Sequence, residues 1–464
     1  MILDSNYNNT GIPPHGAAYV ERLVDLMDPA ANILLNMTQE EAEAAVASGD
    51  PDRVGQIKGQ FAILQKEGKT IRMARSLGRP MRYFLAKRHE GPCLIVAERM
   101  DELLEQLKKE GLDDQFHPSY TRMVPAHHLV EIQLLGCPDP NPVYKRYFTP
   151  EQNVLSTDLN AIGEAYIGAL ADACNDWLDT IDAPSAAKKN NSAKDPIGVL
   201  FSGGIDSGAV FLVMHHLLLK RGESPARLKA FTLSVNEGDD AKQSMAFLHE
   251  LGLSMFLEVI ETDLADISYT DAIRVIEDYK PLDVQSATMA LALCKGVRAR
   301  YPDWKYLIDG DGGDENLKDY PIEENPELTI RSVLNNLMLY QEGWGVEAIK
   351  HSLTYSGGQS RGHIRSYAPA RMLGFSGFSP FALPAVIEVA EGIPFIALTD
   401  WDHEKLYALK GDIVRRGVKA ITGIDMPVFE KRRFQHGAVD KDGFASIFPK
   451  HEAAYRSTFS KLYA

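Results

Sequence analysis

The run Ile197-Gly198-Val199-Leu200-Phe201-Ser202-Gly203-Gly204-Ile205-Asp206-Ser207 decides how this chain folds. Its first five residues are apolar or glycine, the pattern of a short buried strand, and a helical pattern follows at residues 208–221. The glycines between them allow a sharp turn and a close approach of backbone N–H groups to a ligand. A strand that passes through such a turn into a helix is the arrangement with which α/β sheets bind phosphate groups.

Each polar residue of this turn has a place in a phosphate site. We expect Gly203 and Gly204 to offer backbone N–H groups, and Ser202 and Ser207 to donate hydroxyl hydrogens to phosphate oxygens. Asp206 would repel a phosphate, so we predict that it binds Mg²⁺. An ordinary tight turn is the alternative, but the complete six-residue string favours phosphate binding. It is not a Walker loop, because no Gly-Lys-Ser/Thr follows.

A second glycine-rich run, Asp309-Gly310-Asp311-Gly312-Gly313-Asp314-Glu315, directly follows the apolar residues 306–308. Carboxylates this dense repel one another unless a cation neutralises them, and a magnesium-bound nucleotide would supply that cation. A solvated turn or a calcium loop is the alternative, although the calcium pattern lacks its later glutamate. Two glycine loops that follow two sheet strands predict one shared crevice.

The rest of the chain places these loops in an α/β domain. After a helical pattern at 159–178, apolar runs alternate with helical patterns, which predicts a doubly wound parallel sheet; the segments are 197–201, 208–221, 228–235, 241–251, 254–260, 287–301 and 306–308. From residue 328 onward the chain reads as mainly helical. The first 150 residues differ, because short strands at 60–65, 70–74 and 93–97 predict a smaller, antiparallel α+β domain. We therefore expect domains at residues 1–152 and 153–464.

The two loops together resemble those of the asparagine synthetase and β-lactam synthetase superfamily. Its synthetase domain is an ATP pyrophosphatase of the N type, with an adenine nucleotide α-hydrolase-like fold. A third segment, Lys431-Arg432-Arg433-Phe434-Gln435-His436-Gly437, is similar to the family's Lys-x-x-Phe-x-x-Gly motif. The resemblance implies ATP and Mg²⁺ as cofactors. It also assigns Asp206 and Asp314 to the metal, Lys431 to the α-phosphate, and Gly310, Leu233 and Ser234 to the nucleotide.

The amino-terminal part is similar, more weakly, to the family's glutaminase domain of the Ntn type. The matching segments are Gly59-Gln60-Phe61-Ala62 and Ala74-Arg75-Ser76-Leu77-Gly78-Arg79-Pro80. The family's nucleophile is a cysteine after the initiator methionine, whereas Ile2 stands here and the first cysteine is Cys93. A glutaminase of this kind needs that thiolate. We therefore expect a degenerate domain that does not hydrolyse glutamine.

By resemblance, the chain adenylates a carboxylic acid with Mg-ATP, releases pyrophosphate and passes the acyl group to ammonia or a small amine. Asp311 stands where asparagine synthetases carry a glutamate and β-lactam synthetases a tyrosine, and a carboxylate suits proton removal from an external amine. A cyclising ligase of the β-lactam or carbapenam synthetase type remains an alternative, as does a catalytically degenerate binding partner. A sulfur- or nucleoside-modifying pyrophosphatase would need a reactive cysteine or a basic face.

Composition limits the partners and the compartment. The 49 Lys and Arg residues against 64 Asp and Glu give a net charge of −15, which disfavours broad contact with nucleic acid. No apolar run reaches the ~20 residues of a membrane helix, and the polar start does not read as a secretion signal. We expect a cytoplasmic protein with small-molecule partners, and a homodimer by analogy with the family.

Overall fold

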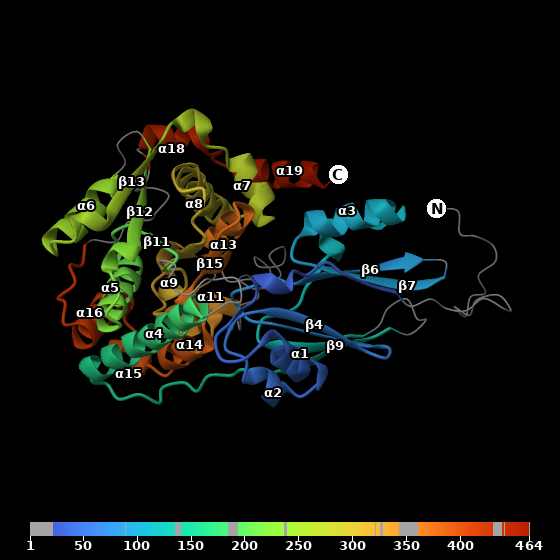
Figure 1. Ribbon diagram of the computed structural model, residues 1–464, viewed down its shortest axis with the longest axis horizontal. Helices are drawn as coiled ribbons and strands as arrows, with labels where there is room; N and C mark the ends of the chain where they lie inside the picture. The colour runs from blue at the N-terminus through green and yellow to red at the C-terminus, as the bar shows by residue number, and fades with distance from the viewer. Residues whose placement is uncertain are drawn as a thin grey trace. The chain divides into compact units, whose positions relative to one another are not determined.

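The computed structural model describes residues 22–88, 90–134, 141–183, 194–235, 239–320, 322–324, 328–342, 361–429, 439 and 441–463 (Figure 1). The chain divides into two compact units, Met1–Thr149 with Tyr463, and Pro150–Leu462. Within the described part of the chain, no helix combines the length and apolar character needed to span a membrane.

Two four-stranded sheets build the first unit, with strand orders β1-β7-β6-β8 and β10-β9-β5-β4. All of their pairs are antiparallel except β1 with β7. A short pair, β2 with β3, stands apart from them. The strands are β1 (Arg22–Asp25), β2 (Ile33–Leu34), β3 (Gly59–Gln60), β4 (Ala62–Glu67), β5 (Thr70–Arg75), β6 (Arg82–Arg88), β7 (Gly91–Ala97), β8 (Arg122–Met123), β9 (His128–Gln133) and β10 (Val143–Arg146).

Alternation along the strands creates three apolar layers in this unit. Met73 of β5 packs with Tyr83 of β6 between the two sheets. Its neighbour Ala74 faces the opposite way, toward helices α1 (Gln39–Ala47) and α2 (Pro51–Gly55). Helix α3 (Met100–Glu110) covers the outer face of the other sheet. The unit is therefore helix, sheet, sheet, helix, which confirms the predicted α+β domain.

The second unit contains one five-stranded sheet whose strands are all parallel, in the order β13-β12-β11-β14-β15. These strands are β11 (Ile197–Leu200), β12 (Leu228–Val235), β13 (Leu257–Thr262), β14 (Tyr306–Ile308) and β15 (Ser376–Phe378). The central strand β11 pairs with β12 on one side and β14 on the other. The parallel sheet is as predicted, but β15 lies in a region that we expected to be mainly helical. Three residues are too few for a periodicity to reveal a strand.

Helices cover both faces of this sheet, so the doubly wound prediction is confirmed. Helix α5 packs against α4 and α16 on one face, whereas α8 packs against α7 and α13 on the other (Figure 1). The helices are α4 (Leu159–Asp182), α5 (Ile205–Lys220), α6 (Asp239–Glu250), α7 (Tyr269–Ile276), α8 (Pro281–Arg300), α9 (Gly313–Asn316), α10 (Ile330–Asn335), α11 (Leu339–Glu342), α13 (Arg361–Met372), α14 (Pro384–Glu391), α15 (Phe395–Thr399), α16 (His403–Thr422), α18 (Lys441–Ile447) and α19 (Glu452–Leu462).

The strand order also locates a binding crevice. From β11 the chain moves outward to β12 and β13, then crosses back to place β14 and β15 on the other side of β11. The winding direction therefore reverses between β11 and β14. Open α/β sheets bind ligands at such a reversal, beyond the carboxyl ends of the strands. Both glycine loops of this chain begin there.

Candidate active site

The first loop joins β11 to α5 in a conformation that requires glycine. Gly203 has a φ of +71°, in the left-handed region, and a Cβ atom there would lie 2.8 Å from the backbone nitrogen of Ser244. The side-chain amide of Gln243 donates a hydrogen bond of 3.1 Å to the Gly203 carbonyl oxygen. Gly204 is the N-cap of α5. Helix α6 therefore supports the loop from behind.

The two serines of this loop lie together at its open side. The Ser207 Oγ accepts a hydrogen bond of 3.3 Å from the Ser202 backbone N–H, and the two hydroxyl oxygens are 3.3 Å apart. The Ser202 Oγ also accepts a 3.3 Å bond from the Gly204 backbone N–H. Both serines line a cavity at the positive N-terminal end of the 16-residue helix α5. Hydroxyls and helix N–H groups here suit an anionic ligand.

The second loop follows β14 and is organised by Asp309. One oxygen of this buried carboxylate accepts a 3.0 Å hydrogen bond from the Asp311 backbone N–H, and the other accepts a 3.0 Å bond from the Ser379 hydroxyl. Gly312 then takes a φ of +103°, which a side chain would strain, before α9 begins. The Asp309 side chain thus links the end of β14 to the segment after β15.

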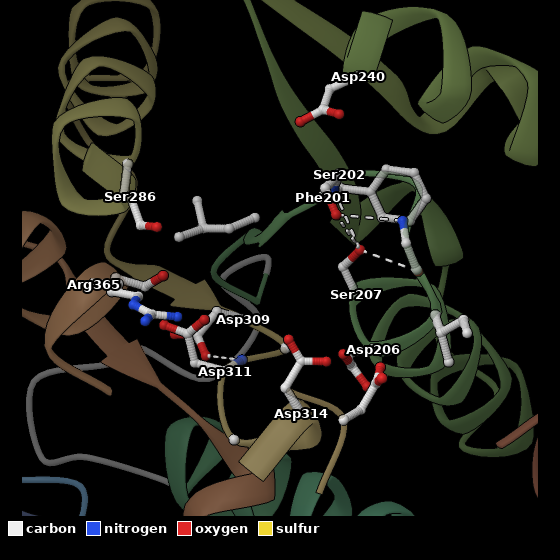
Figure 2. Close-up of a pocket in the computed structure, with 18 of the residues that line it drawn as sticks. Phe201, Ser202, Asp206, Ser207, Asp240, Ser286, Asp309, Asp311, Asp314 and Arg365 are labelled. Carbon is white, nitrogen blue, oxygen red and sulfur yellow. Dashed lines mark hydrogen bonds between the residues drawn. The ribbon is translucent and has the colours of Figure 1, made fainter. Parts of the chain in front are cut away.

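The two loops touch each other, as the shared crevice predicts. A Cβ atom on Gly310 would lie 2.8 Å from the Ser207 backbone nitrogen. A Cβ atom on Gly313 would collide with the Asp206 carboxylate. The glycines therefore bring Asp206 of the first loop beside Asp314 of the second (Figure 2).

A buried lysine joins these two aspartates. The Lys410 Nζ of α16 donates a 2.6 Å hydrogen bond to Asp206, and it also bonds to Asp314. Asp319 lies 3.4 Å from the same nitrogen. Burial alone would lower the pKa of Lys410, but the charges of Asp206, Asp314 and Asp319 raise it well above its ordinary value. The lysine is therefore a fixed cation at the floor of the crevice.

Our sequence interpretation missed Lys410, although a signal was present. Leu406, Lys410 and Val414 stand four residues apart on one face of α16, and all three are buried. A lysine on the apolar face of a helix is rarely buried unless it is paired. That pattern marks Lys410 as a residue with a buried acidic partner.

Asp206 and Asp314 are the residues that would hold a magnesium ion in this crevice. Both reach a single cationic atom, the Lys410 Nζ, so their oxygens converge on one point. Oxygen ligands suit Mg²⁺, which usually keeps water and phosphate oxygens in its remaining positions. Among the described residues no cluster of three or more His, Cys, Asp or Glu side chains forms a metal site. Phosphate oxygens and water would therefore complete the coordination.

The cavity extends from these aspartates to a second group of polar residues. Its volume is about 250 Å³, and its far wall carries Asp309, Asp311, Ser286 and Arg365 (Figure 2). Burial raises the pKa of Asp309 to about 7. Burial and the charge of Asp309 raise the pKa of Asp311 well above its ordinary value. The end of the crevice that suits phosphate groups and the end lined by Asp309 and Asp311 thus belong to one cavity.

Among the predicted ligands that the structure describes, three do not line this cavity: Gly203, Leu233 and Ser234. Leu233 and Ser234 are buried on β12, paired with Ile260 and Glu261 of β13, and their contact with adenine stays a prediction. Lys431 lies outside the described residues. The reactive cysteine of the sulfur-transfer alternative is not Cys294, because burial raises the pKa of that thiol to about 12.

Fold and site together define an α/β domain whose two glycine loops meet at the reversal of strand order, and comparison with known proteins shows what this domain is similar to. Residues 185–370 match the family model for asparagine synthase. They contain both loops. The "Probable asparagine synthetase [glutamine-hydrolyzing]" of Acanthamoeba polyphaga mimivirus is 24% identical over 131 residues, which cover 28% of this chain and 23% of that protein. Residues 185–370 of this chain are therefore similar to the synthetase domain of the asparagine synthetase superfamily.

Proposed function

We propose that this protein is an ATP-dependent, AMP-forming amide ligase. The observation that carries the proposal is the meeting of the two glycine loops at the reversal of strand order, where Asp206 and Asp314 both bond to the Lys410 Nζ. That cluster suits the phosphates of Mg-ATP, and the rest of the same cavity leaves room for an acid. The match of residues 185–370 to the asparagine synthase family model supports the same reaction class.

In the first step the substrate carboxylate attacks the α-phosphorus of ATP. A bond forms from the carboxylate oxygen to phosphorus, and pyrophosphate leaves with the electron pair of the broken P–O bond. Ser202, Ser207 and the N–H groups at the start of α5 would bind the departing phosphates. Asp206 and Asp314 would hold Mg²⁺, which supplies charge neutralisation on the phosphates when bound. Lys410 would hold the two aspartates in register.

In the second step a neutral amine attacks the acyl carbon, and AMP leaves with the electron pair of the broken C–O bond. The new C–N bond makes the nitrogen cationic, so a base must take one proton. Asp311 is the residue that we assign to this role, because its carboxylate lines the cavity. Its Oδ2 is buried and has no hydrogen-bond partner among the described residues.

Pyrophosphate release from Mg-ATP, measured across a panel of amino acids and of mono- and dicarboxylic acids with and without ammonium chloride, tests the proposal. We expect acid-dependent release that ammonium increases, with AMP as the other product. Asp206→Asn should lose this activity, while Asp172→Asn, on the exposed surface of α4, should retain it. Full turnover without an added amine would indicate a cyclising ligase instead. No turnover, together with no ATP binding by calorimetry, would indicate a degenerate binding partner.

A further inference from the structure

Two adjacent residues of α13, Arg365 and Ser366, line the cavity together with Asp311. In Figure 2 the Arg365 guanidinium lies beside the Asp309 and Asp311 carboxylates. Sequence motifs do not single out either residue, and the steps above give them no role. Their position next to the proposed base raises the question of what they do to it.

Arg365 is held rigidly from the opposite helix. Its Nε and Nη2 both donate to the Oδ1 of Asp283, at 3.0 and 2.8 Å. Asp283 lies in the first turn of α8 and is buried, so this ion pair fixes the plane of the guanidinium. Burial alone would lower the pKa of Arg365, but the Tyr320 hydroxyl and the Asp283 carboxylate raise it. A permanent positive charge therefore stands beside Asp311.

Ser366 and Asp311 line the same cavity. The Ser366 hydroxyl donates a hydrogen bond to Asp311, which lowers the pKa of that carboxyl. The Arg365 charge acts in the same direction, whereas burial, Asp309 and Glu315 act in the opposite direction. The Asp311 Oδ2 has no hydrogen-bond partner among the described residues, so one carboxylate oxygen remains available to a ligand.

We propose that Ser366 and Arg365 are positioning residues that orient the Asp311 carboxylate, with one oxygen held by Ser366 and the other directed at the incoming amine. Asp283 takes part by fixing Arg365 from α8. This inference rests on the proposed function and adds a role for α13. The second glycine loop carries the base Asp311, and α13 sets the orientation and charge of the Asp311 carboxylate. A buried carboxylate surrounded by Asp309 and Glu315 needs such support to accept a proton at neutral pH.

The test separates the two half-reactions in the full-length protein. ATP–pyrophosphate exchange reports adenylation, and a quenched-flow single turnover with ammonium chloride reports amide formation. Both use the acid that gives the fastest exchange in the panel. Ser366→Ala should slow amide formation on the order of ten-fold, since it removes one hydrogen bond to a charged group. The acid limb of its pH profile should move to higher pH, because Asp311 loses a stabilising donor.

Matched variants make the result specific. Ser366→Thr keeps the hydroxyl and should restore most of the rate and the pH profile. Arg365→Lys keeps the charge but loses the paired hydrogen bonds from Nε and Nη2 to Asp283. It should therefore slow amide formation more than exchange. The control is Ser460→Ala on α19, an exposed serine whose hydroxyl donates only to the carbonyl oxygen of Arg456, and it should behave as wild type.

Each possible result supports or overturns the positioning role. A slower amide step in Ser366→Ala, with a shifted pH profile and intact exchange, supports it. Intact exchange with an unchanged amide step and profile overturns it and leaves the ligase proposal standing. An equal loss of both half-reactions, with Mg-ATP binding still present by calorimetry, also overturns it, because the two residues would then serve the whole site. No exchange in the wild type with any acid overturns both proposals.

Discussion

Lys410 is buried in the second unit and forms ion pairs with three carboxylates. Its positive charge compensates the negative charges of Asp206 and Asp314. Removing one member of a buried ionic cluster leaves the others uncompensated, which costs more than the cluster contributes when it is intact. The lysine therefore has a structural role as well as a place in the candidate site. Its two roles can be measured separately.

Lys410→Met should lower the free energy of unfolding by about 2–4 kcal/mol, because Asp206 and Asp314 then face each other without a cation. Mg²⁺ should recover part of this loss, since its charge can replace that of the ammonium group between the same oxygens. Melting temperatures with and without MgCl₂ measure both effects. Lys405→Met, at an exposed position of the same helix, is the control. A variant whose melting temperature MgCl₂ does not raise would contradict the predicted metal site.

Asp278 gives a prediction about pH. Burial, and then the charge of Asp283, raise its pKa to about 7 from an ordinary 3.8. Between these two pKa values the folded protein keeps a proton on Asp278 that the unfolded chain has lost. The contribution of this group to the free energy of unfolding is therefore complete below pH ~4 and is lost as the pH rises through 7. Asp278→Asn cannot ionise, and its side-chain oxygen can still accept the 2.6 and 3.1 Å bonds from the Tyr279 and Lys280 N–H groups.

Between pH 4 and pH 8, Asp278→Asn should lose less unfolding free energy than the wild type, by on the order of 1–3 kcal/mol. Urea unfolding at the two pH values measures the difference. The same substitution at the exposed Asp172 should leave the pH dependence unchanged. If Asp278→Asn instead destabilised the protein equally at both values, Asp278 would be ionised in the folded state at pH 4.

At the scale of elements, the two glycine loops pack directly against each other, and glycine is needed where their backbones approach most closely. Gly310 has no strained φ, but a Cβ atom there would lie 2.8 Å from the Ser207 nitrogen and 2.9 Å from the Asp206 carbonyl carbon. Both atoms belong to the backbone and cannot move aside as a flexible side chain could. A methyl group would have to push the loops apart.

Gly310→Ala should therefore abolish detectable Mg-ATP binding while leaving most of the fold intact, because the strain falls on the loops and not on the sheet. Isothermal calorimetry measures the binding, and circular dichroism reports the fold. Gly168→Ala on α4 is the matched control, since the nearest atom to its Cβ would be 3.9 Å away. Helix propensity predicts a neutral or slightly stabilising effect there. Normal ATP affinity in Gly310→Ala would show that the loops do not need this contact.

At the scale of the whole molecule, the chain is two compact units, and the first of them has three apolar clusters of its own. Units of this kind unfold separately unless a large interface couples them. A ligand that binds one folded unit stabilises that unit, by about 2.7 kcal/mol at a hundred-fold excess over its dissociation constant. Mg-ATP should therefore stabilise the second unit, which contains both glycine loops.

Differential scanning calorimetry should resolve two transitions, of which Mg-ATP raises only one. Asp206→Asn should remove that shift and leave the other transition where it is. A single transition that moves as a whole with the nucleotide would mean that the units unfold together. That result would contradict the separate behaviour expected of two compact units.

Sequence alone predicted the parallel sheet and the meeting of the two glycine loops. Apolar runs that alternate with helical patterns admit few other folds, and Gly203, Gly204 and Gly310 mark where the backbone must turn tightly. These are local properties, set by a few neighbouring residues and by the periods of helix and strand. Both loops resemble one family, and the match of residues 185–370 to that family's model confirms the resemblance. It could be recognised from sequence because each motif is a run of neighbouring residues.

Only the tertiary structure decided which distant residues complete the site. Lys410 is 204 positions from Asp206, and Arg365 is 82 positions from Asp283. Strand β15 joins the sheet only because β14 offers it an edge. Such pairings depend on how whole helices and strands pack, and packing is fixed by the summed burial of many side chains. No short stretch of sequence contains that sum. The partners of the polar residues on α13 and α16 could therefore be identified only from the packed structure.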